Sequence, residues 1–152
     1  MKAFLTLTTL LLTVALASAN WHCGNGQCGN DELCWGMDNN HHCMKLWDCH
    51  DVSLQITCIG TWVDAKNGRT YSQFDVTIHN HMGRNIKQIF IGTDHTLCLR
   101  DNNSIWNVVR CNDNQDLTLP NNVDVNAHAS YTFGFIVEGR QEPHLWVKAV
   151  TF

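Results

Sequence analysis

Apolar and polar residues alternate along most of the chain from residue 54 onward. Phe74, Val76 and Ile78, for example, are each followed by a polar residue. A period of two places successive side chains on opposite faces, which predicts a strand with one buried face. The same alternation recurs in six other segments: Leu54–Cys58, Ile89–Ile91, Leu97–Leu99, Leu117–Leu119, Tyr131–Val137 and Leu145–Ala149.

Turn-forming residues separate these segments. Gly, Asn and Pro gather at Lys66-Asn67-Gly68, at Pro120-Asn121-Asn122 and at Glu138-Gly139-Arg140. Short strands at about ten-residue intervals, with no helical pattern between them, are typical of an antiparallel sandwich. We therefore predict an all-β protein in which residues 52–152 form an antiparallel β-sandwich.

Residues 20–51 have a different character. This stretch is rich in Cys, Gly and Asn and shows almost no alternation of apolar and polar positions. It can bury little apolar surface, so we predict a small module held together by disulfides. Its cysteines and the next one downstream allow fifteen pairings, which the sequence leaves open: Cys23, Cys28, Cys34, Cys43, Cys49 and Cys58.

The eight cysteines are an even number, which in an exported chain predicts four disulfides. Cys98 and Cys111 are the two that lie outside the N-terminal cluster, and they flank one loop. We predict that they pair with each other. Closing a loop of about fourteen residues stabilises a fold by roughly 3 kcal/mol in the chain-entropy model.

The first nineteen residues look like a secretory signal peptide. Met1-Lys2 is a short basic start, Ala3–Ala17 is almost wholly apolar or Thr, and Ala17-Ser18-Ala19 has the small residues of a cleavage site. We therefore predict secretion, with residues 1–19 removed. No later segment approaches twenty apolar residues, so we expect no membrane partner.

The charge balance argues against nucleic acid. The chain has 10 Lys and Arg against 14 Asp and Glu, and the basic residues form no cluster. An acidic surface repels phosphate backbones.

No catalytic constellation stands out. Two of the Glu residues, Glu138 and Glu142, flank a turn, and most Asp lie in turns where they bond to their own backbone. No G-x-S-x-G motif occurs. We expect no catalytic residues and no cofactor.

Four histidines lie among the N-terminal cysteines: His22, His41, His42 and His50. The Cys-x4-Cys and Cys-x5-Cys spacings do not match a zinc ribbon, and an oxidising compartment favours disulfides over metal-bound thiolates. We expect no metal site.

Six Trp are a high number for a chain of this size. An aromatic ring laid against the C–H face of a sugar excludes water without using charge. Stacking on a neutral polysaccharide therefore fits this composition, although any single Trp in a small sandwich more often belongs to the core than to a binding platform.

Several short motifs in order carry a family resemblance: WVDAKNGRTYSQFDVTIHN at 62–80, IKQI at 86–89, SIWN at 104–107, LP at 119–120 and SYTFGFI at 130–136. Over residues 52–152 the chain resembles carbohydrate-binding modules of family 49. These are cellulose-binding domains at the C-terminus of certain plant endoglucanases and in secreted, cellulose-associated matrix and coat proteins. The resemblance implies a β-sandwich that binds crystalline cellulose through surface aromatics and has no catalytic activity.

By position, the resemblance implies Trp62, Tyr71 and Trp106 as the residues that contact sugar. Tyr71 lies at a polar-face position of its strand, so we expect it to be exposed. Trp62 falls on the buried face unless a bulge at Gly60 reverses the alternation. The sequence does not decide on which face of the sheet Trp106 lies.

Asn102-Asn103-Ser104 is the one N-glycosylation sequon of the chain. A glycan on Asn102 would lie close in sequence to Trp106. Either this side chain points away from the binding face or Trp106 is not a sugar contact.

We interpret the chain as a secreted, non-catalytic protein that binds cellulose or a related β-glucan in an extracellular matrix or coat. The Cys-rich region could contact other matrix proteins, act as a spacer or protect the N-terminus. The alternatives are a structural, protein-interacting matrix protein without sugar binding, and a small hydrolase or its accessory protein.

Overall fold

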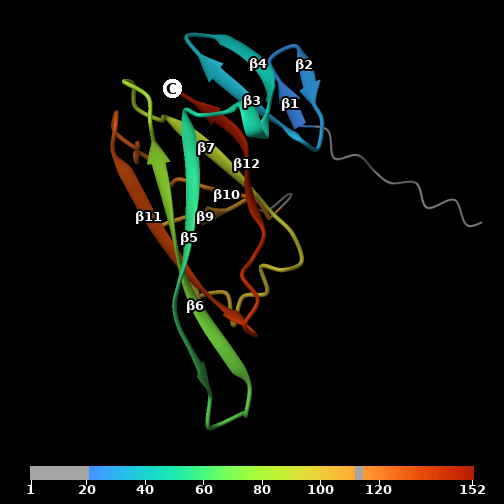
Figure 1. The fold of residues 1–152 in the computed structure, drawn as a ribbon, viewed down its shortest axis with the longest axis vertical. Helices are drawn as coiled ribbons and strands as arrows, with labels where there is room; N and C mark the ends of the chain where they lie inside the picture. The colour runs from blue at the N-terminus through green and yellow to red at the C-terminus, as the bar shows by residue number, and fades with distance from the viewer. Residues whose placement is uncertain (1–20, 112–114) are drawn as a thin grey trace, which may run out of the picture.

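The protein is a β-sandwich of two packed sheets (Figure 1), as a computed structural model of residues 21–111 and 115–152 shows. The predicted signal peptide lies outside these residues. The four-stranded sheet has the order β5 (Val52–Val63), β6 (Thr70–Asn80), β11 (Ser130–Glu138), β8 (Ile105–Trp106). The six-stranded sheet has the order β4 (Asn40–Lys45), β3 (Glu32–Met37), β12 (Leu145–Thr151), β7 (Gln88–Thr93), β10 (Leu117–Thr118), β9 (Val109–Arg110). A separate hairpin pairs β1 (Trp21–Cys23) with β2 (Gly26–Cys28).

The core lies between the two sheets and confirms the all-β prediction. The inward residues of β6 and β11 that the alternation identifies are almost wholly buried, except for the partly buried Tyr131, and Phe74 packs against Phe135 with ring centroids 5.9 Å apart. The β5–β6 hairpin is longer than the rest of the sandwich and projects beyond its lower end in Figure 1. The core is completed from the other sheet by Ile89, Ile91, Leu117, Val147 and Val150.

The Cys-rich region continues the six-stranded sheet. Strand β3 pairs in parallel with β12, with Cys34 opposite Ala149 and Gly36 opposite Thr151. This is the one parallel pair among the described strands, which are otherwise antiparallel. Leu33 on β3 is only 1% exposed and belongs to the main core. Residues on both sides of position 52 therefore share one sheet and one core.

Two disulfides hold the β1–β2 hairpin to this sheet. Cys23 bonds to Cys34 and Cys28 bonds to Cys43, which selects among the pairings that the sequence leaves open.

The described residues do not contain the expected bond between Cys98 and Cys111. The two cysteines lie beside different sheets. The Cys98 carbonyl accepts a hydrogen bond from the N–H of Glu138 on β11, whereas the Cys111 N–H donates to the carbonyl of Asp116 just before β10. Their pairing stays a prediction for peptide mapping without reduction.

Other departures from the predicted strands are local. The segment Leu97–Leu99 forms only an isolated bridge, from Leu99 to Val137 at the edge of β11. Strands β8 and β9, of two residues each, are too short to show alternation. A 3-10 turn, η1 (Leu46–Asp48), joins β4 to β5. Among the described residues, no helix has the length and apolar character that crossing a bilayer requires.

Replacing Leu33 tests whether the Cys-rich region and the sandwich unfold together. We expect Leu33→Ala to lower the free energy of unfolding by about 2–5 kcal/mol, because it leaves a cavity in the shared core. Urea denaturation followed by circular dichroism measures this change. Trp47→Ala, at a side chain that is 64% exposed, is the matched control and should change stability by less than about 0.5 kcal/mol. Two separate transitions, with only one moved by Leu33→Ala, would contradict a shared core.

Candidate functional site

The face of the four-stranded sheet that points away from the core is here called the outer face. Its side chains come from the positions that alternate with the core residues, so polar groups dominate it. The Thr77 and Thr132 hydroxyls, directly opposite each other on β6 and β11, are 3.0 Å apart. The outer face is therefore a polar, hydroxyl-bearing surface on which single aromatic rings stand out.

Trp106 lies flat on the outer face. It is paired with Gly134 of β11, and a Cβ atom added to Gly134 would come within 2.4 Å of the indole ring. The ring thus rests on bare backbone, and the Asp75 carboxylate lies at the same spot from β6. The structure answers the question that the sequence leaves open: Trp106 is half-buried and lies on the outer face.

Trp62 reaches the same face because of a bulge. The register of β5 against β6 shifts between Cys58 and Gly60, which reverses the alternation for the rest of the strand. Trp62 consequently lies opposite Tyr71 and is 38% exposed. Ile59 and Val63 beside it are 53% and 58% exposed, so the projecting hairpin has an apolar surface.

Tyr71 is on the expected face, but the expectation that it is exposed is wrong. Only 5% of the residue is accessible. The Trp62 ring lies 6.2 Å from it, and Asn67 in the hairpin loop donates a hydrogen bond of 3.0 Å to its hydroxyl. Tyr71 therefore packs beside Trp62 and offers little surface of its own.

The three predicted aromatics thus lie on one face, in two groups. Asp75, beside the Trp106 ring, and Tyr71, beside Trp62, are four residues apart on β6, a distance of about 13 Å by the rise of a strand. The Thr77 hydroxyl lies beyond Asp75, on the side away from Tyr71. This arrangement suits an extended ligand with repeating apolar and polar groups.

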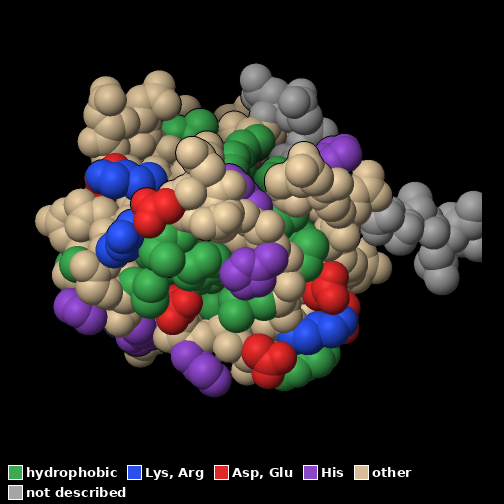
Figure 2. Space-filling view, turned by 90° about the horizontal axis from the view of Figure 1, so that it is seen from above, with side chains coloured by type: hydrophobic (Ala, Val, Ile, Leu, Met, Phe, Trp, Pro, Cys, Tyr) green, Lys and Arg blue, Asp and Glu red, His purple; other side chains and the backbone are tan. Residues whose placement is uncertain are grey.

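Two ion pairs lie on or near this face. Arg69 bonds to Glu138 at 3.1 Å, and Arg100 bonds to Asp101 at 2.8 Å. The hydrogen bond from Arg100 lowers the pKa of Asp101. The end of the molecule seen in Figure 2 likewise shows basic side chains directly beside acidic ones. With both Arg side chains engaged by carboxylates, neither offers a free counter-charge to an anionic ligand.

Two histidines extend the polar part of the outer face. His79 contacts the Ser130 hydroxyl at 2.8 Å and the Gln55 amide oxygen at 3.1 Å, and His81 contacts Ser53 at 2.9 Å. The two imidazoles stack with centroids 6.1 Å apart. Sequence reasoning missed these residues, although His79 alternates with Ile78 and Asn80 in a way that places it outside the core.

The sequon lies at the start of the segment that carries Trp106. Asn102 is exposed in the turn before β8, where the Asn103 N–H donates to the Asp101 carboxylate at 2.9 Å. Glycosylation of Asn102 stays a prediction. A glycan there would begin beside the sheet edge formed by β8.

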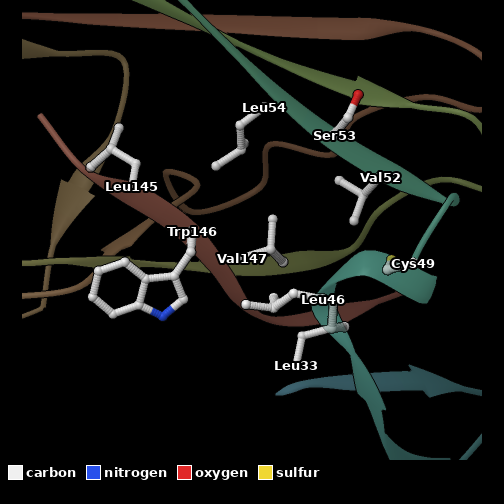
Figure 3. A pocket seen from close by; sticks show the side chains of 9 residues that line it. All are labelled: Leu33, Leu46, Cys49, Val52, Ser53, Leu54, Leu145, Trp146 and Val147. Carbon is white, nitrogen blue, oxygen red and sulfur yellow. The ribbon is translucent and has the colours of Figure 1, made fainter. Parts of the chain in front are cut away.

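Two other features do not form a comparable site. A hollow of about 310 Å³ opens between the sheets beside β5 and β12 (Figure 3), but six of its nine lining residues are Leu or Val, so few polar side chains converge there. The sulfurs of Cys23, Cys28 and Cys34 lie within 4.8 Å of one another, yet all three are oxidised in disulfides and are not thiolate ligands.

Comparison with known proteins agrees with this geometry. The family model described as "Carbohydrate binding domain CBM49" matches residues 52–139, which include Trp62, Tyr71 and Trp106. Two proteins of Dictyostelium discoideum, stalk-specific protein B and stalk-specific protein A, are each 47% identical to this chain over 158 residues. Each alignment covers the full length of this chain and of the relative.

A solved structure is less similar. The GH20 exo β-N-acetylglucosaminidase of Vibrio harveyi matches 67% of this chain with 12% identity and a TM-score of 0.47. The match spans only 18% of that enzyme's length. At this level it supports no statement about activity.

Adding a methyl group to Gly134 tests whether the Trp106 ring packs on the backbone of β11. We expect Gly134→Ala to tilt the indole away from the sheet, because the new Cβ would lie 2.4 Å from the ring. Near-ultraviolet circular dichroism should then lose part of the Trp signal, while the far-ultraviolet spectrum keeps its strand signature. Gly60→Ala is the control, since no atom lies within 4 Å of a Cβ there. Equal near-ultraviolet spectra for both variants and the parent would show that the ring does not rest on Gly134.

Proposed function

The chain belongs to the CBM49 family of carbohydrate-binding domains, and from this premise we propose that it is a secreted, non-catalytic protein that binds cellulose on the outer face of its four-stranded sheet. The observation that carries the proposal is the placement of Trp106 and Trp62 on one face of the sheet, next to β6 positions that are about 13 Å apart along the strand. Aromatic rings that share one sheet face suit stacking on the sugar rings of a polymer surface.

The polar side chains that follow the Trp106 ring along the outer face support a neutral polysaccharide. Hydroxyl and amide side chains such as Thr77, Thr132 and Gln55 can exchange hydrogen bonds with sugar hydroxyls. Arg69 and Arg100 are each engaged by a carboxylate, so an anionic polymer would gain no free counter-charge from them. Stacking then supplies the apolar part of the contact.

We place this activity in an extracellular matrix. The relatives in Dictyostelium discoideum carry the name "stalk-specific", and their similarity spans the whole chain. The N-terminal pattern of a signal peptide and the two disulfides fit an oxidising, extracellular setting. We propose a role in a cellulose-containing structure, where the Cys-rich region also contacts other matrix proteins.

Retention on insoluble cellulose tests the function. We expect Trp106→Ala and Trp62→Ala each to weaken retention about fivefold, because a stacked ring contributes on the order of 1 kcal/mol beyond area burial. Tyr71→Ala should act in the same direction by removing the support of Trp62, whereas Tyr71→Phe keeps the ring and should bind like the parent. Retention should be nearly independent of salt, since no charge pairing is involved. Depletion from solution measures the effect, with chitin and starch as comparison solids.

Trp47→Ala is the matched control, because this Trp is exposed but lies on η1, away from the outer face. Far-ultraviolet circular dichroism checks that each variant is folded. If folded Trp106→Ala and Trp62→Ala are retained like the parent, the outer face is not the binding face. If the parent itself is not retained, the alternative of a structural matrix protein without sugar binding takes its place.

A further inference from the structure

A second pair of Trp residues lies on the opposite side of the sandwich, on the face of the six-stranded sheet that points away from the core. The β1–β2 hairpin covers part of this face, where Cys23, Cys28, Cys34 and Ala149 form a small second core. A groove opens beside this cover. It is named here the Trp21–Trp146 groove and is lined by Trp21, Gly29, Asn30, Glu32, Trp146 and Lys148.

The Trp146 ring is fixed on backbone, as the Trp106 ring is. Trp146 is opposite Gly92 on β7, and a Cβ added there would lie 2.3 Å from the indole. Figure 3 shows this side chain on the other side of β12 from Leu145 and Val147, which face the hollow between the sheets. His144 continues the line of rings, with its centroid 5.0 Å from that of Trp146.

The Trp21 ring is held from two directions. It packs on Phe90 of β7 with centroids 5.2 Å apart, and the Lys148 ammonium lies 4.2 Å from its ring centroid. Lys148 is itself fixed by a bond of 2.6 Å to the buried Asp116 carboxylate. Both indoles are therefore preorganised, so a ligand would not have to order them.

Fixed polar groups line the floor and rim of the groove. The Glu32 carboxylate accepts from the Gly29 N–H at 2.9 Å and pairs with Lys45 at 3.0 Å. These contacts, the Gly29 hydrogen bond first, lower the pKa of Glu32, so its carboxylate stays ionised at neutral pH. Each charge in the groove has its counter-charge in place, which favours a neutral ligand with hydroxyl groups over an ion.

The size of the groove indicates how such a ligand would lie. Its volume is about 130 Å³, below the roughly 300–1,000 Å³ of pockets that enclose a small molecule. The groove can therefore hold only part of a ligand that runs on across the surface, as a polymer does.

The groove is separate from the family's domain. All six lining residues lie outside residues 52–139, the segment that the family model matches. The groove exists only because the Cys-rich region packs beside β12. Its position gives that region a role in ligand contact.

We propose that the Trp21–Trp146 groove is a second carbohydrate-binding site, which takes one or two units of a single neutral polysaccharide chain. Because the outer face lies on the other side of the sandwich, the protein then bridges two polymer surfaces. The choice of a β-glucan as ligand rests on the proposed function, whereas the existence of the groove does not.

Binding of a soluble oligosaccharide isolates the groove. The probe is cellohexaose, titrated by calorimetry into the chain from residue 20 in a Trp106→Ala background, so that the outer face is already weakened. We expect a further Trp146→Ala change to reduce the affinity at least about fivefold through loss of one stacking ring. Asn30→Arg should do the same by filling the groove from an exposed position, which leaves folding undisturbed. Trp47→Ala in the same background is the control.

Bridging is the second readout. The parent should clump a dilute suspension of cellulose nanocrystals, measured as turbidity. Trp146→Ala and Asn30→Arg should stay bound to the crystals but lose the clumping, while Trp47→Ala clumps them like the parent. Such a separation of binding from bridging would not arise from a merely structural role of these residues.

The outcomes separate this inference from the proposed function. If Trp146→Ala and Asn30→Arg bind cellohexaose and clump nanocrystals like their parents, the groove is not a sugar site, even where Trp106→Ala loses retention on cellulose. If Trp106→Ala is retained on cellulose like the parent while the groove variants lose affinity for cellohexaose, the groove is a sugar site and the proposed role of the outer face is wrong.

Discussion

Burial of one face of β6 and β11 is the constraint on which the rest of the structure depends. Phe74 and Phe135 can both reach the core only in one register, since a shift by a single residue would turn every side chain to the other face. The same register brings Thr77 opposite Thr132 and Asp75 opposite Gly134. The layout of the outer face is thus a by-product of packing the inner one.

Two local devices then adapt this layout to carry large rings. The bulge near Gly60 turns the end of β5 over, so that Trp62 leaves the buried side of its strand. Glycine in mid-strand leaves backbone bare at Gly134 and Gly92, and an indole lies on each. Both devices locally weaken a strand, and both occur where an aromatic side chain is placed on the surface. The molecule therefore has a similar aromatic seat on each of its two outer surfaces.

Much of this could be predicted from the sequence, because alternation is a local signal. Phe133, Phe135 and Val137 identify their strand and its buried side without any structure, and the order of short motifs identifies the family. The burial of Tyr71 could not be predicted, since it depends on Trp62, which a bulge brings across from the neighbouring strand. The parallel pairing of β3 with β12 joins residues more than a hundred positions apart, and neither segment has a local sequence pattern that predicts the pairing. For the same reason the Trp21–Trp146 groove, which needs both segments, has no signature in the sequence.

The two disulfides have a consequence for the setting in which the molecule works. The β1–β2 hairpin shares no backbone ladder with the six-stranded sheet, and each disulfide links one of its strands to β3 or β4. In a reducing environment the hairpin would keep only its side-chain contacts, and Trp21 at its start would lose a fixed position. Trp62, Tyr71 and Trp106 lie on strands that need neither bond. Reducing thiols would therefore disturb the side that carries Trp21 and leave the outer face unchanged. Production in a reducing cytosol would yield a protein with only one of its two surfaces fully formed.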